Sequence, residues 1–504
     1  MRARLFDQPL LILLIGMAGL SMYLPAIHAA VLLRHAEARA FFYAGTLTLT
    51  VVTLVAIAMA AQPRRRSSMR NLAALVGAYL LLPPILAVPF HDAIGTTSFL
   101  NSYVEMVSSL TTTGASLFEP GRLSSTLHLW RGLVGWMGGF LIWVAASAIL
   151  APLNLGGFEV TAMAEPGQGE TRFTQGGLAD PQQRIVRVTF QLFPIYAGLT
   201  LALWLLLLVL GDPPLVALIH GMSVMATSGI SPLGGVEGAA SGVPGEVVIA
   251  LFLMFGLSRL TFSSDTITTA RRGIQFDPEF RLGMTIALGV TLILFIRHYL
   301  ASFQVSGEAD PMVPLYALWG SLFTILSFLT TNGFESVHWD AARTWSGLGT
   351  SGIILMGLAM MGGGVATTAG GVKLLRVWAL YLHGLREMDR LVHPSSIGHS
   401  RTGSSRIARK GAFFAWIFFM FFAISLMVLM LGFSALGSSF EQSMVLAVAA
   451  LTTTGPLISA SAEVSISLIG LAEGSKLLFC AGMVLGRLEL LAFIALLTSG
   501  FWRD

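Results

Sequence analysis

Long apolar stretches alternate with short polar connections along the whole chain. A membrane-spanning helix needs about 20 consecutive apolar residues, and ten stretches are long enough, or nearly so. They cover residues 10–33, 40–61, 72–90, 127–150, 185–210, 247–262, 282–299, 345–382 (interrupted), 412–431 and 477–497. This pattern predicts an all-α polytopic membrane protein.

The composition agrees with that prediction and excludes several functions. Hydrophobic residues make up 55% of the 504 residues and charged residues only 11%, against about 25% charged in an ordinary soluble protein. The single cysteine, Cys480, permits neither an internal disulfide nor a multi-thiolate metal site. Histidines at HExxH-like spacing and a P-loop string are both missing from the sequence. We therefore expect no enzyme, no covalently bound cofactor and no nucleic-acid partner.

The positive charges predict how the chain is oriented. Lysine and arginine accumulate in cytoplasmic connections of membrane proteins. Here one alternate set of connections is rich in them, at 63–70, 172–187, 271–281 and 373–410, and the opposite set is poorer. With ten spans, both termini lie on the basic side, so both are expected in the cytoplasm, with membrane lipid around the spans.

Four shorter apolar segments, each between two predicted spans, form an internal repeat. They cover 98–110, 215–225, 312–329 and 440–451, and end in LTTTGAS, MATSGIS, LTTNGFE and LTTTGPL. Their glycines are separated by 115, 104 and 122 residues. Because repeats indicate architecture, we expect a two-helix prefix at 1–62 and four parallel span–half-helix–span repeats around a central pore, at 63–184, 185–280, 281–410 and 411–504.

Half-helices that end inside a membrane favour an ion path. Their last carbonyls lack helical partners, and the helix dipole places about half a negative charge there. Rings of such carbonyls replace the hydration shell of potassium, and glycine allows the positive φ that turns them inward. Glu105, in the first half-helix, is either a cation-attracting or a structural acid. The candidate filter residues are Thr112, Thr113, Gly114, Thr227, Ser228, Gly229, Thr331, Asn332, Gly333, Thr453, Thr454 and Gly455.

Two further features lie within predicted spans. GGGVATTAGG places five glycines in ten residues, and each costs a helix about 1 kcal/mol. This stretch either allows close helix packing or forms a movable gate. Arg487 lies near the middle of the last span, and such a charge faces a cavity or a partner; Glu489 is one candidate partner. The gate candidates are Arg487, Gly362, Gly363, Gly364, Gly370, Gly371 and Lys373.

Four motifs resemble the Trk/Ktr/HKT superfamily of potassium transporters, most closely its bacterial TrkH/TrkG branch. They are the T-x-G segments, LGGFEV with the following AEPGQGETR, MGGGVATTAGGVKLLRV (361–377) and GRLELL (486–491). The resemblance implies potassium uptake through a single-layer filter, with Arg487 facing the pore beneath it. It also implies a homodimer and a cytosolic, nucleotide-binding, TrkA-like ring, which we expect to contact the basic loops, including 386–410.

Two alternatives to potassium uptake stay open. An ion-coupled carrier of another small solute also has repeats and broken helices, although such repeats are often inverted and these four share one orientation. A sodium-permeable member of the same superfamily is the other. Glu335, an acid close to the predicted mouth, bears on selectivity. Whether transport is channel-like or coupled to protons or sodium cannot be read from the residues.

Overall fold

The computed structural model describes residues 8–59, 68–153, 155–158, 160, 181–258, 277–302, 313–345, 351–392, 405–462 and 466–497. Within these ranges the chain is helical, with loops and no strand. Seven helical segments are long and apolar enough to cross a membrane: Leu10–Val31, His35–Ala58, Met69–Ile94, Ser125–Leu153, Pro181–Val209, Pro278–Arg297 and Gly411–Ala435. The expected all-α membrane architecture is confirmed.

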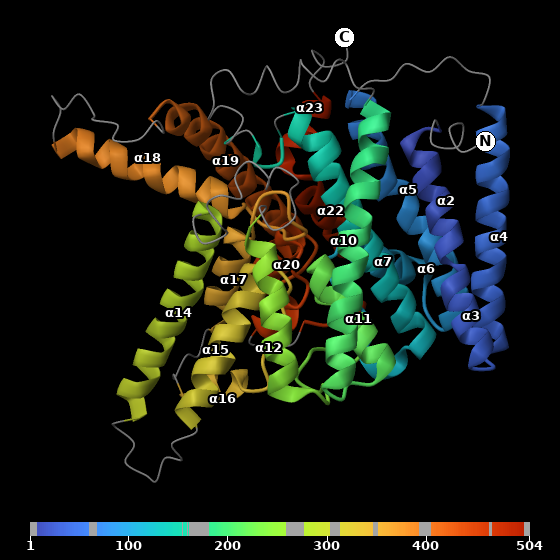
Figure 1. Ribbon diagram of the computed structural model, residues 1–504, viewed down its shortest axis with the longest axis horizontal. Helices are drawn as coiled ribbons and strands as arrows, with labels where there is room; N and C mark the ends of the chain where they lie inside the picture. Colours follow the sequence, from blue (N-terminus) through green and yellow to red (C-terminus); the bar gives the residue numbers. More distant parts are fainter. Residues whose placement is uncertain are drawn as a thin grey trace.

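The first helices form a layer at one side of the bundle (Figure 1). Helices α2 (Leu10–Ser21) and α3 (Tyr23–Val31) make one span with a break at Met22, and both pack against α4 (His35–Ala58). This pair of spans joins the rest of the molecule through α5 (Ser68–Ile94). The arrangement agrees with the predicted two-helix prefix.

The helix order after the prefix is consistent with four repeats of span, half-helix and second helix. The first helices of the four units are α5, α10 (Pro181–Val209), α14 (Pro278–Ser302) and α19 (Ser405–Ala435). The half-helices are α6 (Phe99–Leu110), α11 (Pro214–Ala226), α15 (Val313–Leu329) and α20 (Phe440–Thr452). The second helices are α7 (Ser125–Ala145), α12 (Gly242–Leu253), α17 (Ser351–Met361) and α22 (Glu473–Leu488).

Each second helix loses its regular α-helical form partway along. Helix α7 continues as a π-helical turn, Ala146–Leu150, and α12 as a 3₁₀ turn, Met254–Leu257. Helix α17 ends at the glycine-rich stretch, beyond which α18 (Leu374–Val392) leans out of the bundle (Figure 1). The interruption expected between 345 and 382 is therefore confirmed.

The last predicted span, 477–497, is not the continuous helix that its apolar pattern indicated. Helix α22 ends at Leu488 because Glu489 has φ 63°, and α23 (Leu490–Leu497) begins after it. Positive φ is unusual for a residue with a side chain and occurs where the surroundings impose it. Here Glu489 takes part in a buried ion pair, described below, which a hydropathy pattern does not reveal.

The half-helices are enclosed by protein. Helix α6 packs between α5 and α7, and α11 packs between α10 and α7. Small residues allow this close approach: a Cβ at Gly138 of α7 would overlap the carbonyl of Leu110 at the end of α6, and one at Gly139 would lie 2.8 Å from Ala226 of α11. Irregular backbone at membrane depth requires such shielding. Two more short helices complete the fold: α16 (Trp339–Trp345) and α21 (Leu457–Ala460).

Candidate ion path

The four half-helices end in the same backbone conformation. In each, the residue two positions before the glycine is a threonine in the left-handed region, with φ between 48° and 59°: Thr112, Thr227, Thr331 and Thr453. A β-branched residue rarely adopts this conformation, and such strain gathers at functional sites. The next residue then donates its N–H to a carbonyl five positions back, at 2.9–3.0 Å: Thr113 to Ser108, Ser228 to Ser223, Asn332 to Ser327 and Thr454 to Ala449.

The glycines follow the predicted conformation at three of the four ends. Gly114, Gly229 and Gly333 have φ of 73°, 64° and 82°. Gly455 is not among the positive-φ glycines, so the expectation is wrong there. The next residue explains the difference, because Pro456 has helical φ and ψ and leads directly into α21. The prediction also assigned the left-handed turn to glycine alone, whereas threonine makes an equivalent turn two residues earlier.

The four ends contact one another in chain order and close a ring. A Cβ at Gly114 would overlap the carbonyl oxygen of Ser228, in the second segment. One at Gly229 would overlap the carbonyl oxygen of Asn332, in the third segment, and one at Gly333 would lie 2.9 Å from Pro456, in the fourth. The fourth segment returns to the first, as the next paragraph shows. Segments more than 100 residues apart therefore meet around one point.

The carbonyl oxygens of the residues just before the four glycines have different neighbours in the four segments. Those of Ser228 and Asn332 point toward the glycine of the preceding segment. That of Thr113 accepts the N–H of Gly455 at 2.6 Å, which joins the first and fourth segments. The corresponding oxygen of Thr454 instead accepts the N–H of Leu457 at 3.3 Å within its own turn. Three oxygens thus lie between segments, and the fourth stays within its segment.

The ring itself holds no charged side chain, and carboxylates lie just beyond it. No group of three His, Cys, Asp or Glu residues arranged to hold a metal occurs in the described part of the chain. Beyond the third segment, burial and the neighbouring carboxyl of Glu237 raise the pKa of Glu335 to about 8. Burial also raises the pKa of Glu237. Both residues lie in connections outside the spanning helices, where they supply a negative charge that depends on pH.

The glycine-rich stretch lies directly against the ring. Thr227 and Thr368 are joined through their hydroxyls at 3.2 Å, and the N–H of Gly370 donates to the hydroxyl of Thr331 at 2.7 Å. A Cβ at Gly370 would overlap the carbonyl oxygen of Thr452. We name residues Gly362–Gly371 the gate loop. It contacts the second, third and fourth half-helix ends.

Close packing explains several of the loop's glycines. A Cβ at Gly362 would overlap the carbonyl oxygen of Gly370, so the two ends of the loop touch. Gly364 donates its N–H to Gly256 at 3.0 Å, in the 3₁₀ turn that interrupts the second repeat. Gly363 and Gly371 are similarly crowded, and Gly371 has φ 77°. Of the two interpretations of this stretch, close packing is what these contacts show, and the movable gate stays a prediction.

The buried charges near the gate loop form two arrangements. Arg487 donates to the carbonyl oxygen of Thr368 at 2.6 Å, at the tip of the loop, and Lys373 donates to the carbonyl oxygen of Ala369. Glu489, the acid proposed as a structural partner of Arg487, instead pairs with Arg376 at 2.8 Å. That guanidinium also lies 3.7 Å from the centre of the Phe418 ring. The prediction that Glu489 is the partner of Arg487 is therefore wrong.

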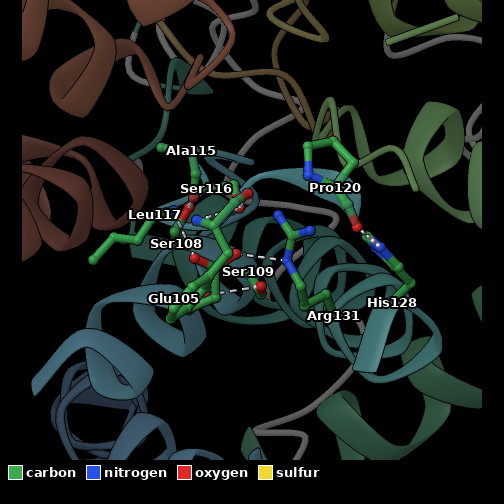
Figure 2. Close-up of polar contacts among 10 residues, drawn as sticks. Glu105, Ser108, Ser109, Ala115, Ser116, Leu117, Pro120, His128 and Arg131 are labelled. Carbon is green, nitrogen blue, oxygen red and sulfur yellow. Dashed lines mark hydrogen bonds and ion pairs between the residues drawn. The ribbon is translucent and has the colours of Figure 1, made fainter. Parts of the chain in front are cut away.

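Glu105 has a structural position (Figure 2). It is fully buried in α6, and its Oε1 lies 2.6 Å from Nε of Arg131 on α7. Its Oε2 accepts the N–H of Leu117, three residues after the first filter glycine, at 2.9 Å. The sequence analysis did not predict the Glu105–Arg131 pair, because hydropathy locates Arg131 in a span but does not indicate which acid it contacts. Of the two alternatives for Glu105, the geometry favours the structural one.

Four half-helices whose ends meet inside a bundle of apolar helices define the class of this protein: a polytopic membrane protein built from span–half-helix–span units. A family model described as "TrkH: Cation transport protein" matches residues 240–500. The chain belongs to this family of cation transport proteins. The motif residues 164–172, which supported the resemblance, lie outside the described residues.

Individual relatives match over most of the chain. The Trk system potassium uptake protein TrkH of Salmonella typhimurium is 28% identical over 493 residues, covering 96% of both sequences. TrkI, a Trk system potassium uptake protein of Halomonas elongata, is 28% identical over 431 residues, covering 85% of this chain and 82% of its own. The crystal structure of the potassium transporter TrkH from Vibrio parahaemolyticus matches with TM-score 0.78 and 25% identity over the whole of both chains.

Proposed function

We propose that this protein takes up potassium across the bacterial cytoplasmic membrane, through a filter formed by its four half-helix ends. The observation that carries the proposal is the closed order of contacts from Gly114 through Gly229 and Gly333 to Gly455. Relatives that are aligned over 96% and 82% of their own length and called potassium uptake proteins support the choice of ion.

The proposed path needs only neutral oxygen ligands. A potassium ion at the ring exchanges its hydration shell for backbone carbonyls, chiefly those of Thr113, Ser228 and Asn332. Opening the ring to an ion requires the hydrogen bond from Gly455 to Thr113 to lengthen. The helix dipoles add negative potential at the same ends. Potassium is the substrate in this proposal, and no covalent chemistry or organic cofactor takes part, so the protein is a transporter and not an enzyme.

We assign the barrier below the filter to the gate loop and Arg487. The loop contacts three of the four filter ends, and Arg487 adds a positive charge at the loop tip. A fixed charge about 4 Å from a potassium ion raises its energy by roughly 4 kcal/mol at an effective dielectric near 20. Withdrawal of the loop therefore lowers both a steric and an electrostatic obstacle.

Assembly and orientation complete the proposal. The family resemblance supports a homodimer with a cytosolic nucleotide-binding ring of TrkA-like subunits, and the bias of basic residues supports cytoplasmic termini. The word "system" in the relatives' names also supports a multi-component assembly. The basic segment 386–410 is the proposed contact with the ring.

The test is rescue of a bacterium that lacks potassium uptake, at low external potassium, with and without a co-expressed ring subunit. Growth with the wild-type chain is the expected result. The flux of potassium is then compared with the flux of sodium in vesicles that contain the purified protein. Sodium flux equal to potassium flux would replace the proposal with the sodium-permeable alternative, and flux of neither ion would overturn it.

A further inference from the structure

In three of the four half-helices, a side chain at one equivalent position contacts the chain that leaves the filter. Nine residues before the four filter glycines stand Glu105, His220, Thr324 and Leu446, all fully buried. Because this spacing is constant, the four side chains occupy equivalent places in the four repeats. Three are polar and one is apolar, and we call this set the minus-nine position.

In the first repeat, the minus-nine side chain binds the exit strand directly. Glu105 accepts the N–H of Leu117 at 2.9 Å. Arg131 holds the other carboxylate oxygen at 2.6 Å and so fixes the direction of the first (Figure 2). The carboxylate thus combines a charge-assisted hydrogen bond from a backbone N–H with an ion pair to an arginine.

In the second repeat, the minus-nine side chain bonds a side chain of the exit strand, and the pair is neutral. His220 Nε2 lies 2.9 Å from the hydroxyl of Ser231, two residues after Gly229. That hydroxyl donates to the carbonyl of Gly235 at 2.7 Å, so its only proton is in use. The bonding pattern therefore assigns the proton to Nε2 of His220, which donates to Ser231.

The third repeat uses a hydroxyl. Thr324 accepts the N–H of Ser336, three residues after Gly333, at 3.1 Å. The hydroxyl of Ser336 also donates to Glu246, on α12 of the second repeat, at 2.7 Å. The exit strand is thus held from its own half-helix and from the neighbouring repeat.

The fourth repeat has no polar group at this position. Leu446 cannot accept a hydrogen bond, and the chain after Gly455 turns at once into α21. In this repeat Gly455 donates its N–H to the carbonyl oxygen of Thr113, in the first segment. The repeat with the apolar residue is also the one whose glycine lacks positive φ and whose filter carbonyl stays within its own turn.

We propose that Glu105, His220 and Thr324 are positioning residues of the filter, which fix three exit strands and so set the discrimination between potassium and sodium, while the fourth segment is held instead by the bond from Gly455 to Thr113. This inference rests on the proposed function. Discrimination between the two ions depends on the number and placement of coordinating carbonyls and on their freedom to move. A carbonyl held by a fixed strand cannot close around the smaller sodium ion.

Thr324→Val is the sharpest test, because valine has nearly the same shape as threonine and removes only the hydroxyl. Flux of potassium and sodium is measured in vesicles that contain the purified, folded protein. We expect the potassium-to-sodium ratio to fall about tenfold, which corresponds to about 1.4 kcal/mol and is within the cost of leaving a buried N–H unpaired.

Three controls separate positioning from general damage. Thr324→Ser keeps the hydroxyl and should keep the ratio. Thr291→Val removes a buried hydroxyl that bonds only within α14, and should leave the ratio unchanged. Leu446→Met alters the apolar minus-nine side chain without adding a polar group, and should also leave it unchanged.

The outcomes distinguish this inference from the proposed function. Selective potassium flux in the wild type with an unchanged ratio in Thr324→Val overturns the inference and leaves the function intact. An equal fall in Thr291→Val also overturns it, because the effect is then not local to the filter. Absence of potassium flux in the wild type overturns both. If Thr324→Val gives little folded protein, His220→Gln provides the same measurement with a side chain that retains an N–H donor and should preserve the ratio, whereas His220→Leu should lower it.

Discussion

The first and fourth repeats form the same helix end from the same five residues, Leu-Thr-Thr-Thr-Gly, but support it differently. Thr112 and Thr453 have nearly the same left-handed φ, 55° and 52°. Beyond the glycine, the first repeat is held by Glu105, whereas the fourth turns into α21 with Leu446 at the equivalent position. The comparison shows that the left-handed threonine turn is common to the two half-helix ends, and that the support beyond it is not.

The buried arginines that follow these two filter segments differ in the same way. Arg131 pairs with Glu105 at 2.6 Å, so the two charges neutralise each other. Arg487 donates to the backbone of Thr368, and none of the ion pairs found among the described residues includes it. The paired charges of Arg131 and Glu105 suit a structural role, whereas the charge of Arg487 is the one to which we assign the proposed barrier.

Breaking the pair in the first repeat should have the largest effect. Arg131→Met leaves Glu105 buried without its partner, which costs about 3–5 kcal/mol. We expect a lower thermal unfolding temperature in detergent and less folded protein. The double variant Glu105→Gln/Arg131→Met removes the buried charge and should recover part of the loss. Equal stability of Arg131→Met and the wild type would contradict a structural role for the pair.

Crowding the ring should reduce transport more than stability. Gly229→Ala places a Cβ on the carbonyl of Asn332 and opposes a φ of 64°. Overpacking costs about 1–3 kcal/mol. If that cost falls on the conducting state, potassium uptake should decrease by about fivefold to somewhat more than a hundredfold. Gly77→Ala is the matched control, because nothing lies within 4 Å of that Cβ. Normal uptake and selectivity in Gly229→Ala would remove the filter assignment.

Neutralising Arg487 should sharpen the contrast between the two arginines. Arg487→Met removes the positive charge at the loop tip, so basal potassium flux should rise severalfold and depend less on the ring subunit, given a barrier of up to roughly 4 kcal/mol. Arg376→Met is the control, because it leaves Glu489 unpaired and should instead lower the yield of folded protein. Unchanged flux at normal yield in Arg487→Met would exclude the barrier role.

The acids beyond the third segment should give the smallest effect, seen as pH dependence. Because burial and Glu237 raise the pKa of Glu335 to about 8, its charge appears as pH rises through 8. The KM for potassium should then fall about two- to fivefold, which corresponds to about 0.4–1 kcal/mol. Over the range from 4.5 to 8 the folded protein holds more protons than the unfolded chain, so stability declines with rising pH. Because the pKa of Glu237 is also raised, Glu335→Gln should weaken both trends and not abolish them, and trends as steep as in the wild type would contradict the assignment.

Sequence reasoning located the ring and the gate loop because both depend on local chemistry. Threonine–x–glycine after a half-length apolar segment marks an interrupted helix, and the glycines of 362–371 mark another. It did not identify Arg376 as the partner of Glu489, because 113 residues separate them. The minus-nine position was readable in principle from its constant spacing, but only the contacts of Glu105, His220 and Thr324 gave it meaning.

The sequence by itself determined the membrane class, the half-helices and the order of the repeats, since hydropathy and helix-breaking residues act over a few turns. Tertiary structure decided which charges pair, which carbonyls lie between segments, and why Gly455 departs from the other three. The physical reason is that a buried charge or carbonyl must be satisfied by whichever group folding brings close. In this chain those groups come from other repeats, as the bond between Gly455 and Thr113 shows.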